Sequence, residues 1–124
     1  MKNKQFEAWA LPILKKYQAV LLLQDHTLDL TYRKELVTEN TLMEHGFNYP
    51  YKHIGICYGN KAVEYFKNKN KKELYDGLIH ELCHSVTDPL YNVAYERFLT
   101  RDALTNERER LTDHIANIII KNVT

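Results

Sequence analysis

Hydrophobic positions near the start of the chain recur with the period of an α-helix. Within residues 4–18 apolar side chains recur at positions i, i+3, i+4, i+7 and i+8, which places them on one stripe of a helix: Phe6, Trp9, Ala10, Ile13, Leu14 and Tyr17. Such a stripe is typical of an amphipathic helix that packs against a core. Pro12 lies inside the segment, so we expect it to kink the helix or to move its start.

The middle of the chain changes to the two-residue period of β-strands. Residues 19–24 and 27–32 are joined by a polar pair, and in the second segment Leu28, Leu30 and Tyr32 alternate with polar residues. Residues 51–58 alternate again, and a Gly-Asn pair after them ends the strand as a turn. Residues 35–48 are weakly patterned, and we expect a loop there, with a short helix as the alternative.

The helical period returns after residue 70. Asn70 and Glu73 have the spacing of an N-cap and its reciprocal partner, and Leu74, Leu78 and Leu82 follow on one face. Because proline cannot continue a helix, we expect this one to end near residues 88–89. A last helix is predicted from residue 103 or 106 to 121, with four side chains facing inward: Leu111, Ile115, Ile118 and Ile119.

The predicted order is one helix, two or three strands and two helices. This order indicates an α+β fold, with one small sheet covered by helices. A length of 124 residues fits a single domain over residues 1–124. Hydrophobic residues make up 44% and charged residues 27%, which is the balance of a globular chain.

The net charge and the number of cysteines indicate which binding partners and which cellular compartment to expect. The net charge of +1 provides no global field for nucleic acid or for an anionic membrane. Two cysteines, Cys57 and Cys83, are fewer than a small secreted scaffold usually carries, which favours reduced thiols in the cytoplasm. No signal-peptide pattern is present, and the longest apolar run, residues 19–23, is far too short to span a membrane.

The strongest chemical signal is the His-Glu-Leu-Cys-His sequence of residues 80–84. His80 and His84 are four residues apart on the best-patterned helix, so their rings lie on one face and can bind one metal ion. Glu81 can point into the same cleft and take a proton from water that zinc has made acidic. The alternative is a surface helix with two incidental histidines, but the motif is in register with the leucine row.

The last helix offers candidates for a third zinc ligand. Glu109 and Asp113 are four residues apart, an arrangement in which the Glu binds zinc and the Asp accepts a hydrogen bond from a zinc-bound imidazole. Glu109 has the alternative role of capping its own helix, since Asn106 lies three residues before it. His114 competes as third ligand, although it points about 100° away from Asp113 around the helix.

Other polar or reactive residues have ordinary interpretations that we prefer. His45 and His53 precede the motif and are further candidates for a ligand, although each alone is more typical of a surface histidine. Cys83 points away from the two motif histidines and is expected to be a small core residue. Tyr91 and Tyr95 are candidates to stabilise an oxyanion, but core or rim packing is the expected role of each in a chain with nine tyrosines.

Residues 73–84, 88–90 and 107–116 together resemble the minimal zincin-like metallopeptidases of phages and prophages. The shared features are a helical His-Glu-Leu-x-His, a nearby Pro-Leu pair and a later Glu-rich helix, and they cover residues 70–120. The resemblance implies a minimal zincin fold with a small sheet of two to four strands, whose strand before the motif helix lies along the cleft. It implies His80, His84 and Glu109 as zinc ligands and Glu81 as general base and acid. Asp113 follows the gluzincin pattern more closely than that of the phage family.

These features predict a zinc-dependent metallopeptidase that acts on a protein or peptide, in a host cytoplasm if the chain is phage-encoded. We expect an extended substrate to pair with an exposed edge of the 51–58 strand. The alternative is a zinc-stabilised binding module without turnover, which grips a host protein. A third class, a zincin associated with nucleic acid, would need a basic face that the net charge does not indicate.

Overall fold

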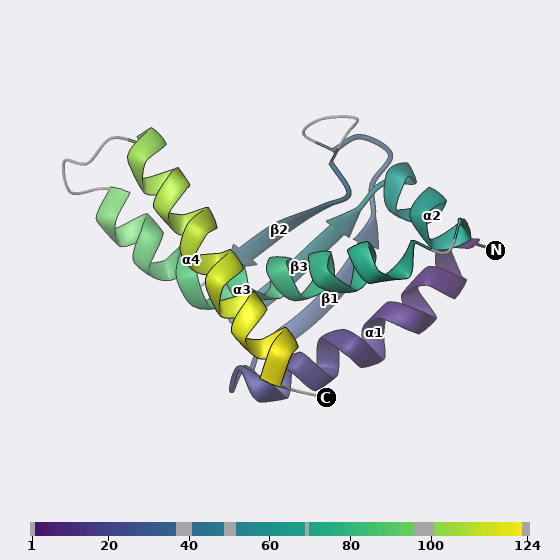
Figure 1. The fold of residues 1–124 in the computed structure, drawn as a ribbon, viewed down its shortest axis with the longest axis horizontal. Coiled ribbons are helices and arrows are strands. Elements are labelled where there is room, and N and C mark those ends of the chain that lie inside the picture. Colours follow the sequence, from purple (N-terminus) through teal and green to yellow (C-terminus); the bar gives the residue numbers. More distant parts are fainter. Residues whose placement is uncertain (1, 37–40, 49–51, 69, 96–100, 123–124) are drawn as a thin grey trace.

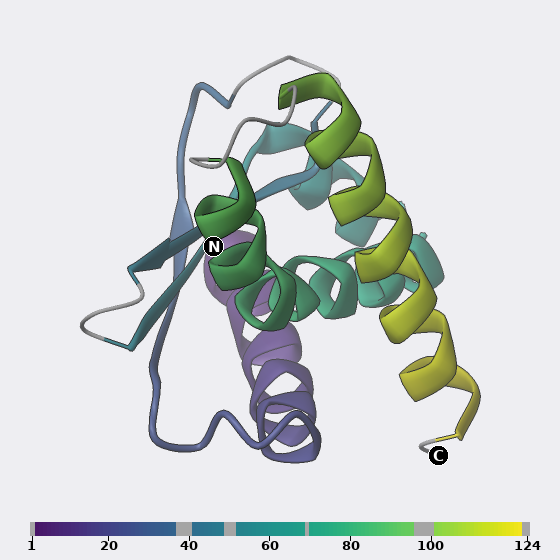
Figure 2. The same cartoon turned by 90° about the vertical axis from the view of Figure 1, so that its left-hand side faces the viewer.

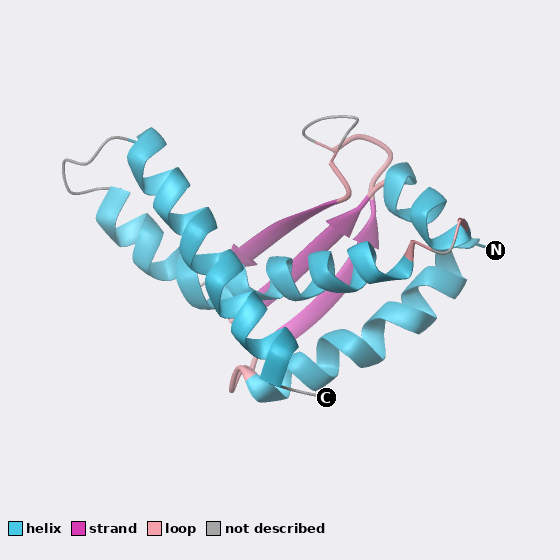
Figure 3. Cartoon of the chain, in the orientation of Figure 1, coloured by secondary structure: helices cyan, strands magenta, loops and turns pink. Residues whose placement is uncertain are grey.

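The chain forms an α+β fold, as predicted (Figures 1 and 3). The computed structural model describes residues 2–36, 41–48, 52–68, 70–95 and 101–122, without the side chains of residues 2, 47–48 and 90–95. Within these ranges no helix has the length and apolar character needed to cross a membrane. The described elements follow in the order α1 (Lys2–Val20), β1 (Thr27–Tyr32), β2 (Met43–Asn48), β3 (His53–Tyr58), α2 (Asn60–Lys67), α3 (Lys71–Tyr95) and α4 (Arg101–Asn122).

The three strands form a mixed sheet in the order β1-β3-β2. β1 pairs with β3 in parallel, with Leu28 opposite Ile54, whereas β2 pairs with β3 in an antiparallel register, with His45 opposite Ile56. The strands predicted at 27–32 and 51–58 are therefore confirmed, although residue 51 lies outside the described residues and β3 begins at residue 53. Residues 19–24 add no strand, because they hold the end of α1 and the turn after it.

β2 was not predicted, and the expectation of a loop over residues 35–48 is wrong for residues 43–48. The alternation is present, since Met43 and His45 share one face and Glu44 and Gly46 the other. A histidine and a glycine weaken the hydrophobic signal of such a short segment. Pairing with β3 supplies the stability that its own composition lacks.

The helices lie on one side of the sheet. Figure 2 shows α1 and α3 against one face and α4 packed on α3, further from the strands. Side chains of β3 that face the helices are fully buried, and those that alternate with them are partly exposed. The core consists mainly of buried side chains from α1, α3 and β3. In that order they are Phe6, Ala10, Leu14 and Tyr17; Leu74, Leu78, Ile79 and Leu82; and Ile54, Ile56 and Tyr58.

Two prolines lie inside helices. α1 begins at Lys2 and continues through Pro12, so the proline does not set its start. α3 continues past Pro89 to Tyr95, and the predicted end near residues 88–89 is wrong. Proline costs a helix about 3 kcal/mol, which packing against a neighbouring helix can offset. α4 supplies that packing, since the buried hydroxyls of Thr87 on α3 and Thr112 on α4 are hydrogen-bonded at 2.9 Å.

Two further details of the helices differ from expectation. The Gly-Asn pair after β3 starts α2 rather than a simple turn, and Gly59 precedes this helix where a Cβ would lie 3.1 Å from Leu36. On α4, Leu111 and Ile118 were expected to face inward but are 36% and 49% exposed. The buried positions are Thr112, Ala116 and Ile119.

Candidate metal centre

The motif helix is held firmly by its apolar side. Four side chains in and beside the motif are fully buried: Leu78, Ile79, Leu82 and Cys83. Cys83 is thus a core residue, as predicted, and burial raises the pKa of its thiol to about 12. Because this side of α3 is locked into the core, the side that carries His80, Glu81 and His84 keeps a defined orientation toward β2 and α4.

The imidazoles of His80 and His84 face one another. Their Nε2 atoms are 3.2 Å apart, and the ring planes are nearly perpendicular, at 85°. The ring of His84 is buried and that of His80 is partly exposed, so the pair lies at the edge of the core. The spacing predicted from the sequence is therefore realised as two nitrogen atoms directed at one point.

A carboxylate binds the other nitrogen of each ring. Nδ1 of His80 is 2.6 Å from Oδ1 of Asp113, and Nδ1 of His84 is 3.0 Å from Oδ1 of Asp88. Since an ionised carboxylate only accepts hydrogen bonds, each Nδ1 carries the donated hydrogen. A neutral ring of this tautomer presents an unprotonated Nε2. The two lone pairs therefore converge, and they repel each other unless a proton or a metal cation lies between them.

Glu109 of α4 completes the convergence. Its Oε1 lies 3.2 Å from Nε2 of His80, and its Oε2 lies 3.5 Å from Nε2 of His84. With zinc–ligand distances of about 2.0–2.2 Å, neighbouring ligand atoms of a tetrahedral site are separated by about 3.3–3.5 Å. The measured separations, 3.2, 3.2 and 3.5 Å, are close to that spacing, although Glu109 approaches the two rings with different oxygens. These residues could hold a metal ion, and imidazole and carboxylate are donors that zinc accepts.

The geometry also tests the alternatives considered for α4. The helix begins at Arg101, so Glu109 is far from its N-terminus and does not cap it. His114 is exposed and does not line the pocket beside the motif. Glu109 and Asp113 both reach the motif histidines, whereas His114 points elsewhere.

Glu81 lies beside the two rings. Ligand atoms of His80, Glu81 and His84 lie within 4.8 Å of one another, but Glu109 makes the shorter contacts with both rings. Oε2 of Glu81 is buried and has no hydrogen-bond partner among the described residues. Burial raises the pKa of Glu81 to about 7, although His84 and His80 act to lower it. A carboxyl group in this position is ready to gain or lose a proton near neutral pH.

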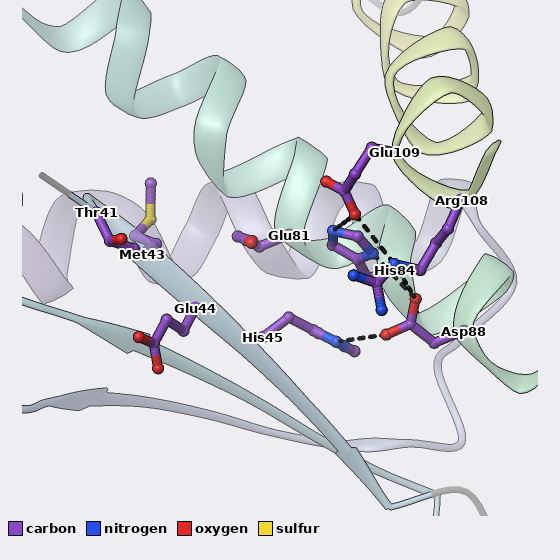
Figure 4. A pocket seen from close by; sticks show the side chains of 9 residues that line it. All are labelled: Thr41, Met43, Glu44, His45, Glu81, His84, Asp88, Arg108 and Glu109. Carbon is purple, nitrogen blue, oxygen red and sulfur yellow. Dashed lines mark hydrogen bonds and ion pairs between the residues drawn. The ribbon is translucent and has the colours of Figure 1, made fainter. Parts of the chain in front are cut away.

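A pocket of about 520 Å³ opens beside these groups (Figure 4). Among its lining residues, His45, Asp88 and Arg108 are ionisable groups that were not assigned to the predicted site. Arg108 donates from Nε to Oε2 of Glu109 at 3.0 Å and lies 3.9 Å from Asp88. The pocket is lined by β2, α3, α4 and the residues before β2: Thr41, Met43, Glu44, His45, Glu81, His84, Asp88, Arg108 and Glu109.

The sequence contained indications of Asp88 and His45, but each was interpreted in another way. Asp88 is four residues after His84, the spacing that places two side chains on one helix face, but it was taken as the helix end. His45 was taken as a surface histidine because the strand that carries it was not predicted. Burial acts to raise the pKa of Asp88, but hydrogen bonds from His45 and His84 outweigh it and hold the pKa well below its usual range.

Of the other candidates, His53 lies away from the site, and two tyrosines have side chains outside the described residues. His53 lies on β3, where it is bonded to Thr27 at 2.7 Å and lies 3.2 Å from Asp29 on the side of the sheet away from the helices. The predicted oxyanion donors, Tyr91 and Tyr95, lie in α3, but their side chains are outside the described residues.

The candidate centre thus joins three elements that are distant in the sequence. α3 supplies the two histidines and Glu81, α4 supplies Glu109 and Asp113, and β2 closes one wall of the pocket. Figure 4 shows Glu81, His84 and Glu109 of this group. Comparisons with protein-family models, with curated proteins and with solved structures found no match, so the proposals below rest on this geometry.

Proposed function

We propose that this protein is a zinc-dependent metallopeptidase. His80, His84 and Glu109 bind the metal, and Glu81 moves the proton. The observation that carries the proposal is the convergence of two Nε2 atoms and one carboxylate within 3.2–3.5 Å, beside a buried carboxyl group. The fold around it is α+β, with the motif helix packed between a small sheet and a C-terminal helix. This arrangement supports the minimal zincin-like assignment.

A bound metal is supported by the electrostatic repulsion that the site would otherwise contain. Two lone pairs and a carboxylate directed at one point repel each other, and a buried imidazolium is the alternative way to relieve that repulsion. Asp113 and Asp88 hold the rings so that both Nε2 atoms stay directed there. Carboxylates bound to the outer nitrogen of an imidazole are the usual neighbours of zinc-ligating histidines.

Support for catalysis comes from the open pocket and from Glu81. Structural zinc sites are closed by four protein ligands, whereas catalytic sites keep one position for water or substrate. Among the described residues three groups converge, and the pocket opens next to them. Glu81 offers a buried oxygen without a partner, which is a cost in stability that a purely structural site does not require.

The chemistry that fits these groups is hydrolysis of a peptide bond. Zinc, when bound, polarises the scissile carbonyl and makes water acidic. Oε2 of Glu81 accepts a proton from the attacking water and delivers it to the leaving amine. Glu109 and the two histidines would hold the metal beside that carboxyl group. Burial of Glu81 keeps bulk water from competing for the proton.

The sheet edge next to the pocket suits an extended protein or peptide substrate. β3 pairs with a neighbour on both sides, so the expectation that a substrate pairs with residues 51–58 is wrong. β2 is an edge strand, and Met43 and His45 on its inner face line the pocket. A peptide added to β2 would gain main-chain hydrogen bonds without displacing a strand.

The test is the Glu81→Gln variant, with Glu107→Gln as the matched control. Glu107 is an exposed α4 residue bonded to Arg110 at 2.9 Å, outside the pocket. Each protein is incubated with a denatured-protein mixture and a peptide library, cleavage is followed by mass spectrometry, and zinc is measured in the same samples. We expect Glu81→Gln to lose cleavage by at least about 100-fold while retaining zinc and fold.

Two outcomes contradict the proposal. Unchanged cleavage by Glu81→Gln would remove the role of Glu81. Absence of cleavage by the zinc-loaded wild type on every substrate would favour the alternative, a zinc-stabilised module that binds a protein without turnover.

A further inference from the structure

Asp88 lies at the junction of three elements that build the candidate centre. Its Oδ1 accepts the hydrogen of His84 Nδ1 at 3.0 Å, one helical turn away on α3. Its Oδ2 faces Nδ1 of His45 on β2 at 3.5 Å, and Arg108 of α4 lies 3.9 Å from its Oδ1. The side chain is 18% exposed, so this carboxylate depends on these partners for its solvation.

His45 fixes Asp88 from the side of the sheet. Its side chain is only 3% exposed, and its Nε2 is bonded to Oγ of Ser85 at 2.9 Å. Its ring is stacked on that of His84, with centroids 5.6 Å apart and planes inclined by 26°. Both ring nitrogens thus face polar groups of α3, and Figure 4 shows the ring directed at Asp88.

We propose that Asp88 and His45 form a positioning pair for the metal ligand His84. Asp88 holds the Nδ1 hydrogen, and His45 holds Asp88. The proposal rests on zinc binding by His84, as proposed above. A carboxylate on the outer nitrogen keeps the ring in the tautomer whose Nε2 is unprotonated, and it makes that nitrogen a stronger donor to a metal.

The pair also connects the edge strand β2 to the proposed metal ligand His84. β2 contacts α3 through His45 at the same place where β2 lines the pocket. His80 has its own orienting carboxylate, Asp113, which comes from α4. The last helix therefore orients His80, whereas Asp88 of the motif helix itself orients His84 and is supported from the sheet by His45.

The experiment measures zinc affinity rather than activity. Dissociation constants are determined by competition with a chromophoric chelator for wild type, Asp88→Ala, Asp88→Asn, His45→Ala and the double variant with both alanines. Unfolding of each metal-free protein is measured in parallel, and affinities are compared at a temperature where all are folded. The matched control is His53→Gln, because His53 is also a strand histidine paired with an aspartate but faces away from the helices.

We expect Asp88→Ala to weaken zinc binding about 10- to 100-fold and Asp88→Asn to weaken it less, since Asn keeps an acceptor oxygen. His45→Ala is expected to weaken it by a smaller factor. The double variant should bind zinc as tightly as Asp88→Ala does, because His45 acts on zinc binding through Asp88. The d–d absorption bands of bound cobalt should shift in Asp88→Ala and stay unchanged in His53→Gln.

The opposite results separate the two proposals. Zinc affinity and cobalt spectra equal to wild type in both Asp88 variants, with only a lower unfolding temperature, would reduce the pair to a structural contact and overturn this inference. Independent, multiplying losses in the double variant would overturn the role of His45. A wild-type chain that binds no zinc would overturn the proposed function together with this inference.

Discussion

Nε2 of His80 and Nε2 of His84 lie 3.2 Å apart, while Nδ1 of each ring is bonded to a carboxylate. The bonds at Nδ1 leave no hydrogen for Nε2 in a neutral ring, so the short separation places two lone pairs against each other. Glu109 adds a carboxylate at the same point. The arrangement is stable only with a cation at its centre or with an added proton on a ring.

Glu81 makes the metal-free protein sensitive to pH. Its pKa is raised from the usual 4.5 to about 7, so its contribution to stability is fully present below pH 4.5 and is lost as the pH rises through 7. In the presence of a chelator, Glu81→Gln should therefore become more stable than wild type above pH 7, by about 1–3 kcal/mol. Urea unfolding from pH 4.5 to 8 measures the difference between the two proteins. A difference that does not change with pH would mean that the Glu81 carboxyl is not desolvated.

Asp113 and His114 are neighbours that the structure assigns to different surroundings. Asp113 accepts the hydrogen of His80 Nδ1 at 2.6 Å, whereas His114 is exposed. We expect Asp113→Ala to weaken zinc binding about 10- to 100-fold and His114→Ala to leave it unchanged. Chelator competition on the two variants checks this. The reverse pattern would restore His114 as the third ligand.

Ile118 and Ile119 give a matched test of how α4 packs. Ile119 is 8% exposed and Ile118 is 49% exposed. Ile119→Ala should destabilise the fold by about 2–4 kcal/mol because it leaves a cavity, and Ile118→Ala should cost less than about 1 kcal/mol. Denaturant unfolding measures both. Equal costs would mean that the two faces of α4 are buried alike, for example through a partner on the outer face.

The sequence predicted the parts of the fold whose pattern is local. The stripe of α1, the alternation of β1 and β3 and the leucine row of α3 each follow from the period of a single element. The end of α3 could not be predicted in this way, because packing of α4 on α3 carries the helix through Pro89. β2 depends similarly on its pairing with β3 more than on its own residues.

The candidate site likewise contains residues that local spacing predicts and residues that only long-range packing brings in. The spacing of His80 and His84 and the spacing of Glu109 and Asp113 are periodicities of single helices, and the structure brings all four side chains together. His45 enters the site only because β2 is folded against α3, a long-range relationship that no spacing in one sequence reveals. Asp88 could have been predicted as a neighbour of His84, because side chains four residues apart share one face of a helix.

Metal content tests the account most directly. Wild type, Glu109→Ala and the matched surface variant Glu107→Ala are purified under the same conditions, dialysed against limiting zinc and analysed by mass spectrometry for bound metal. The geometry predicts about one zinc per chain in wild type and Glu107→Ala, and loss of most of it in Glu109→Ala, because zinc would keep only two protein ligands. Full zinc in Glu109→Ala, or none in wild type, would contradict the proposed centre.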